Sequence, residues 1–109
     1  MQFQQIMDRA MQVRGLYEEK EKELYGSPRT SEEIAAGFLG DAGNVAKLID
    51  AKNGNRKILN SKAMLEHQFA NCLWSMIVLA NIHGVDLEKS FFIEMDRLET
   101  HLLENPPES

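Results

Sequence analysis

The chain contains four segments in which apolar residues recur every three or four positions, and a glycine or proline follows each segment. Such spacing places the apolar side chains along one face of a helix. Helices commonly end at or just before a glycine or proline, because proline lacks the backbone N–H and glycine readily adopts the left-handed conformation. The pattern therefore predicts helices over about residues 1–24, 31–52, 61–83 and 87–104.

Helix-start signals agree with these boundaries. Thr30 and Glu33 have the spacing of a capping box, and Asp86 is an N-cap residue for the last segment. Short connections between helices of this length favour a bundle. The chain is therefore predicted to be an all-α four-helix bundle that forms a single domain over residues 1–109.

The third predicted helix is apolar on almost every side over residues 72–80. This pattern predicts a helix buried on most sides. Trp74 and the methionines are expected in the core, and Cys72 is expected to pack as a small hydrophobe. The excess of apolar surface predicts a homodimer or a homotetramer.

Two stretches have an ambiguous or polar pattern. Gly37, Gly40 and Gly43 recur every third residue, which fits either a loop or a helix with a bare face that a neighbouring helix or ligand can approach. The charged run over residues 18–23 is predicted to be a solvated, salt-bridged helix end.

The amino-acid composition limits the cellular compartment and the kinds of binding partner that this chain can have. The net charge of −5 and the pI near 5.1 argue against a broad nucleic-acid or anionic-membrane surface. The single Cys72 excludes an internal disulfide and fits a reducing compartment. With neither a signal peptide nor an apolar run of about 18 residues, the chain is expected to be cytoplasmic.

Two polar pairs are candidates for chemistry. Asp41 and Asn44 are three residues apart on the second predicted helix, and Gln68 and Asn71 are three apart on the third. This spacing brings two side chains to one helix face, about 5–6 Å apart. Their oxygens suit a hard cation held between helices, although a buried hydrogen-bond network or a solvent-facing surface fits the same spacing.

Three stretches of the chain, residues 37–49, 68–81 and 84–91, resemble the MazG-like nucleotide pyrophosphohydrolases. The resemblance extends over residues 30–103. It implies an all-α protein that assembles as a dimer or tetramer. It also implies use of Mg²⁺ to activate a water that cleaves a nucleoside triphosphate to the monophosphate and pyrophosphate.

The family motif is Glu-Glu-x-x-Glu followed, after a gap, by Glu-x-x-Asp. This chain has Gly40, Asp41, Asn44, Gln68 and Asn71 at the five positions. The resemblance implies Asp41 as the catalytic residue and the last four of these positions as metal ligands. Only one carboxylate remains, and an amide brings a dipole instead of a charge and cannot act as a general base.

We therefore expect weak or absent Mg²⁺ binding without nucleotide, and weak or absent hydrolysis. A nucleoside triphosphate is the expected partner, and Lys47 is the candidate phosphate contact, unless it is a solvated surface charge. For Trp74 and the methionines, stacking on a nucleotide base is the alternative to a place in the core. The alternatives are a non-catalytic relative that binds nucleotide or only a partner protein, and a variant inactivated by shape-conserving substitutions.

Overall fold

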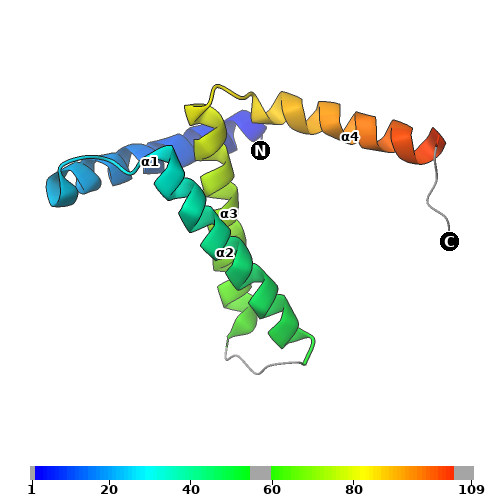
Figure 1. Ribbon diagram of the computed structural model, residues 1–109, viewed down its shortest axis with the longest axis horizontal. Coiled ribbons are helices and arrows are strands. Elements are labelled where there is room, and N and C mark those ends of the chain that lie inside the picture. Colours follow the sequence, from blue (N-terminus) through cyan, green and yellow to red (C-terminus); the bar gives the residue numbers. More distant parts are fainter. Residues whose placement is uncertain (1, 55–59, 105–109) are drawn as a thin grey trace.

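The computed structural model describes residues 2–54 and 60–104, and within these ranges it contains four α-helices and no strand (Figure 1). The helices are α1 (Phe3–Tyr25), α2 (Ser31–Lys52), α3 (Ser61–Ile82) and α4 (Leu87–Glu104). The all-α prediction is confirmed, and each helix boundary among the described residues lies within two residues of its predicted position. Met1 and the prolines at 106–107 lie outside the described residues.

The predicted capping residues form the expected hydrogen bonds. The backbone N–H of Glu33 donates to Thr30 Oγ1 at 3.2 Å, and the backbone N–H of Thr30 donates to the Glu33 carboxylate at 3.1 Å. Asp86 Oδ1 accepts from the backbone N–H of Lys89 at 3.1 Å. These bonds satisfy N–H groups that have no partner within the helix, and so they fix where α2 and α4 begin.

Helices α2 and α3 form the centre of the molecule. They run antiparallel and side by side, and α1 packs across α3 near one end of this pair (Figure 1). The buried apolar side chains lie on these three helices: Ala10, Ile34, Leu48, Ala51, Leu65, Ile77 and Val78. The core therefore lies where α1, α2 and α3 meet, and it fixes the relative positions of α2 and α3.

The three regularly spaced glycines lie inside α2, which is continuous from Ser31 to Lys52. The loop interpretation is therefore wrong, and the helical one is confirmed. A Cβ added at Gly37, Gly40 or Gly43 would meet no atom within 4 Å. The bare helix face is therefore open, and in the described part of the chain no other helix approaches it closely.

Gly40→Ala is expected to stabilise the protein by about 0.5–1 kcal/mol, because alanine loses less backbone entropy than glycine in a helix and nothing crowds its methyl group. Urea unfolding measures the change. Gly54→Ala is the matched control and should be destabilising, since Gly54 has φ +87° in the turn after α2. Destabilisation by Gly40→Ala would contradict an open α2 face.

Helix α4 projects from the end of α3, away from the rest of the molecule (Figure 1). None of its residues is buried. Over residues 72–80 of α3, Leu73 and Met76 are exposed, at 39% and 41%, and the other residues are buried or half-buried. The prediction of a helix buried on most sides is therefore confirmed except on the face that carries these two residues. The core prediction also fails for Met64, Met76 and Met95, which are exposed, because none of the four described helices covers these faces.

Within the described ranges, no helix has the length and apolar character needed to span a membrane.

Candidate functional site

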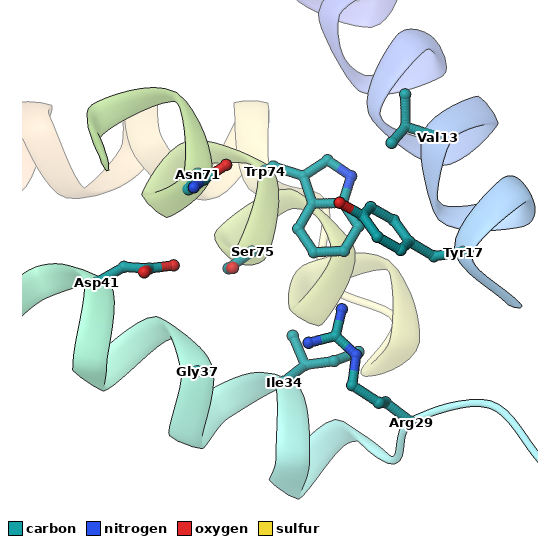
Figure 2. A pocket seen from close by; sticks show the side chains of 9 residues that line it. All are labelled: Val13, Tyr17, Arg29, Ile34, Gly37, Asp41, Asn71, Trp74 and Ser75. Carbon is teal, nitrogen blue, oxygen red and sulfur yellow. The ribbon is translucent and has the colours of Figure 1, made fainter. Parts of the chain in front are cut away.

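A cavity of about 240 Å³ opens where α1, α2 and α3 meet (Figure 2). Its wall combines aromatic, charged and amide groups with bare backbone. The lining residues are Val13, Tyr17, Arg29, Ile34, Gly37, Asp41, Asn71, Trp74 and Ser75. Residues far apart in the sequence thus share one small space, which makes this cavity the candidate site.

Two of the predicted site residues line this cavity. Asp41 comes from α2 and Asn71 from α3, and both lie at the same end of the cavity, beside Ser75 (Figure 2). Helix packing therefore brings one member of each polar pair into the cavity, whereas the spacing argument expects both members of each pair. Asn44, Gln68 and Lys47 are not part of the lining, and Asn44 and Lys47 are exposed.

The two α3 amides differ in their hydrogen bonding. Asn71 Nδ2 lies 3.1 Å from His67 Nε2, which fixes the amide plane and leaves the Asn71 oxygen as an acceptor. Gln68 Oε1 is buried and has no hydrogen-bond partner. An unpaired buried acceptor costs about 1–3 kcal/mol, so this oxygen would gain from a cation or a donor group.

The donor set does not fit a resident Mg²⁺ ion. Within residues 2–54 and 60–104, no three His, Cys, Asp or Glu side chains are grouped so that they could hold a metal. Mg²⁺ gives up its hydration water only to strong oxygen ligands, normally carboxylates together with substrate phosphates. Among the four predicted ligands only Asp41 is anionic, so the charge needed to hold the ion is missing even where amide oxygens are present.

Cys72 is half-buried next to the polar pairs. Burial raises the pKa of its thiol, and the negative charge of Asp41 raises it further. The thiol therefore stays protonated at neutral pH, which agrees with packing as a small hydrophobe and gives no support for a nucleophilic role.

The aromatic wall of the cavity comes from α1 and α3. The ring centroids of Tyr17 and Trp74 are 5.3 Å apart, with the planes tilted by 57°. Trp74 Nε1 donates to the backbone carbonyl of Ala10 at 3.1 Å, which holds the indole against α1. Trp74 is only partly buried, and it lines the cavity instead of filling the core.

Arg29, which the sequence analysis missed, supplies the only cationic side chain of the cavity lining. Glu21 holds it from two sides. The backbone N–H of Arg29 donates to Glu21 Oε1 at 2.8 Å, and Arg29 Nε donates to Glu21 Oε2 at 2.9 Å. Its guanidinium carbon also lies 5.7 Å from the centroid of the Tyr17 ring, a cation–π distance.

Arg14 completes this network from α1. Its Nη2 donates to the Arg29 carbonyl at 3.1 Å, and its Nη1 lies 3.6 Å from Glu21 Oε1. Arg14 and Glu21 are only 6% and 7% exposed. The prediction of a solvated helix end is therefore wrong for Glu21, because the turn after α1 brings Arg29 back over this residue.

The Glu21 carboxyl is held in its charged form. Burial raises its pKa, but hydrogen bonds from the backbone and side chain of Arg29 and the charges of Arg29 and Arg14 outweigh burial, so the net pKa is lowered. The sequence contains one signal for this pair. Arg14 lies among the apolar positions of α1, and Glu21 follows seven residues later, two turns along the same face.

Comparisons with protein-family models, curated proteins and solved structures find no match for this chain. The cavity itself offers a fixed guanidinium, two aromatic rings, one carboxylate and one amide oxygen. Guanidinium groups bind phosphate and carboxylate groups, and aromatic rings stack on planar apolar groups. This combination suits a small ligand that has an anionic group and a planar group.

Proposed function

We propose that this protein is a MazG-like nucleotide-binding protein that hydrolyses nucleoside triphosphates slowly or not at all. The observation that carries the proposal is the cavity in which Arg29, Tyr17 and Trp74 share one space with a single carboxylate, Asp41. Those groups are suited to binding a nucleotide, whereas the charge and the general base needed for metal-assisted hydrolysis are depleted.

The proposed roles follow the chemistry of each side chain. Arg29 contacts a phosphate group, and the rings of Tyr17 and Trp74 contact the base. Ligand pockets for whole small molecules have volumes of about 300–1,000 Å³. Since this cavity has a volume of about 240 Å³, it holds part of a nucleotide and leaves the remainder in the open mouth.

Hydrolysis is expected to be slow because the site around Asp41 lacks the carboxylates that would bind Mg²⁺ and activate water. Asn71, beside Asp41, cannot accept a proton from water as a carboxylate can. A triphosphate would bring Mg²⁺ with its own anionic ligands, and Asp41 would then be the only anionic side chain among the four predicted ligands. With Mg²⁺ or Mn²⁺, pyrophosphate release from a panel of nucleoside triphosphates should be slower than about 0.01 s⁻¹, below the usual enzyme range.

Binding is tested separately from hydrolysis. Arg29→Gln is expected to weaken nucleoside triphosphate binding by about 10- to 100-fold in calorimetric titrations, because it removes a charge-assisted hydrogen bond to phosphate. Arg9→Gln is the matched control, since Arg9 is exposed on α1, lies outside the cavity lining and donates to Gln12 Oε1. Equal affinities in the two variants would exclude Arg29 as the phosphate contact. Turnover above the stated rate would contradict only the loss of hydrolysis.

A second candidate is a relative that binds only a protein partner. The exposed apolar side chains of α3 and α4 favour it, since surfaces of this kind mark sites of protein association. Absence of binding for every nucleotide tested, together with a stable protein assembly, would support this candidate instead.

A further inference from the structure

Two side chains at one end of the candidate cavity have polar groups that no other described residue pairs with. Ser75 is 5% exposed, and its hydroxyl makes no hydrogen bond within residues 2–54 and 60–104. Since buried hydroxyls in folded proteins are normally hydrogen-bonded, this group is suited to a ligand that supplies the missing partner. The Asp41 carboxylate points toward Ser75 across the same cavity, and it has no hydrogen bond or ion pair in the described part of the chain (Figure 2).

These side chains present a defined set of donors and acceptors. An ionised carboxylate accepts on both of its oxygens, whereas a serine hydroxyl can also donate. Asn71 adds an amide oxygen at the same end, because its Nδ2 lies 3.1 Å from His67 Nε2 and its oxygen stays available. The complementary ligand edge therefore has an acceptor for the Ser75 hydroxyl and adjacent N–H donors for Asp41 and Asn71.

The space beside these groups suits a flat ring. Gly37 lies on α2 between Asp41 and Ile34, and a Cβ added to it would meet no atom within 4 Å (Figure 2). The rings of Tyr17 and Trp74 form the aromatic part of the wall. Proteins that bind single nucleobases combine such stacking surfaces with hydrogen bonds to the edge of the base.

The order of donors and acceptors favours guanine among the common bases. Its edge carries O6, N1–H and the N2 amino group in a row, which is one acceptor followed by two donors. Ser75 can donate to O6 while the Asp41 carboxylate accepts from N1–H and N2–H. Adenine and cytosine would turn an unprotonated ring nitrogen toward this carboxylate, and uracil and thymine would turn a carbonyl oxygen toward it.

We propose that this end of the cavity binds the edge of a guanine base, with Asp41 and Ser75 as the residues that determine base specificity. This inference rests on the proposed nucleotide-binding function and deepens it. The sugar is attached to guanine on the side remote from this edge, so the phosphates extend toward Arg29 at the other end of the cavity (Figure 2). Because the carboxylate bonds to the base, guanine recognition needs no Mg²⁺.

Calorimetric titrations with guanosine, inosine and uridine triphosphates in EDTA test the donor pattern, because inosine lacks only the N2 amino group of guanosine. Guanosine triphosphate should bind about 10-fold more tightly than inosine triphosphate and about 100-fold more tightly than uridine triphosphate. Equal affinities for the three would overturn this inference and leave the proposed function standing.

Nucleosides without phosphate separate the two proposals. Guanosine and inosine should bind more weakly than their triphosphates in ligand-detected NMR titrations, with the same preference of about 10-fold for guanosine. If guanosine binds as tightly as its triphosphate, the base contact stands and the phosphate contact at Arg29 is wrong. Absence of binding by every nucleoside and triphosphate would overturn both proposals.

Asp41→Asn replaces one acceptor by an N–H donor. It should weaken guanosine triphosphate binding by about 10- to 100-fold and should tighten binding of xanthosine triphosphate, which has a carbonyl in place of the N2 amino group. The gain separates altered recognition from a folding defect. Asp96→Asn is the matched control, since Asp96 is exposed on α4 and lies outside the cavity lining. A guanine preference that Asp41→Asn leaves intact would overturn the inference.

Ser75→Ala tests the contact to O6. Guanosine and inosine triphosphates both carry O6, so the variant should weaken both by about 5- to 10-fold and leave their ratio unchanged. Ser90→Ala, at an exposed serine on α4, should change neither affinity. Unchanged affinities in Ser75→Ala would contradict the role of this hydroxyl.

Discussion

The triple variant Asn44→Glu, Gln68→Glu, Asn71→Asp is expected to be stabilised by Mg²⁺ by about 3 kcal/mol at 10 mM, whereas the unmodified protein gains less than about 0.5 kcal/mol. The variant changes the charge of the four predicted ligand positions from −1 to −4. Each added carboxylate near a divalent ion contributes several kcal/mol of attraction even at an effective dielectric constant of about 20. A dissociation constant near 0.1 mM gives the stated stabilisation.

Without Mg²⁺ the same variant should be less stable than the unmodified protein, because four carboxylates on two adjacent helices repel one another. Asp41 and the residue at 71 already line one cavity. Position 68 has its side-chain oxygen buried, and position 44 lies one turn beyond Asp41. Urea unfolding with and without Mg²⁺ measures both effects, and pyrophosphate release shows whether the restored site also hydrolyses nucleotide.

The control adds the same three charges elsewhere. Gln12→Glu, Asn53→Asp and Asn81→Asp change exposed amides outside the predicted ligand positions. Equal stabilisation of both triple variants by Mg²⁺ would show that the ion acts by general charge screening and not by binding at the predicted ligand positions. If the first variant shows no response to Mg²⁺, the two polar pairs do not meet at one site.

The helices were predictable because their signals are local. Thr30, Glu33 and Asp86 cap the helix that follows each of them, and they do so regardless of what packs against the helix. The pairing of Asp41 with Asn71 needed one more step, the adjacency of α2 and α3 in a helical fold. Helical spacing therefore predicted that Asp41 and Asn71 lie close together, but it did not predict the other residues that line the cavity.

The features that the sequence did not predict depend on contacts between distant parts of the chain. Glu21 belongs to a charged run and becomes buried only because residues 26–30 turn back and place Arg29 against it. Met76 belongs to an apolar run and remains exposed because no helix within residues 2–54 and 60–104 covers it. Periodicity gives the face on which a side chain lies, whereas burial depends on the partner that this face meets.

Glu21→Gln is expected to lower the free energy of unfolding by about 3 kcal/mol at pH 7. The substitution leaves the buried guanidinium of Arg14 with only the partly exposed carboxylate of Glu18, at 3.9 Å, as an anionic partner. Breaking a buried ion pair by removing one partner costs about 3–5 kcal/mol, and Glu18 offsets only a small part of this loss. It also weakens the hold on Arg29, so nucleoside triphosphate affinity should fall with stability. Glu23→Gln is the matched control, because Glu23 is exposed and pairs with exposed Lys20 at 3.9 Å, and it should cost less than about 0.5 kcal/mol.

The pH dependence identifies the cause of this loss. The Glu21 carboxyl has a lower pKa in the folded state than its ordinary 4.5. Its contribution to stability is therefore fully present above about pH 4.5 and is lost as the pH falls through the folded-state pKa. The difference in unfolding free energy between the unmodified protein and Glu21→Gln should shrink in that acidic range. A difference that stays constant with pH would mean that altered packing at position 21, and not the charge held between Arg14 and Arg29, is what stabilises this end of α1.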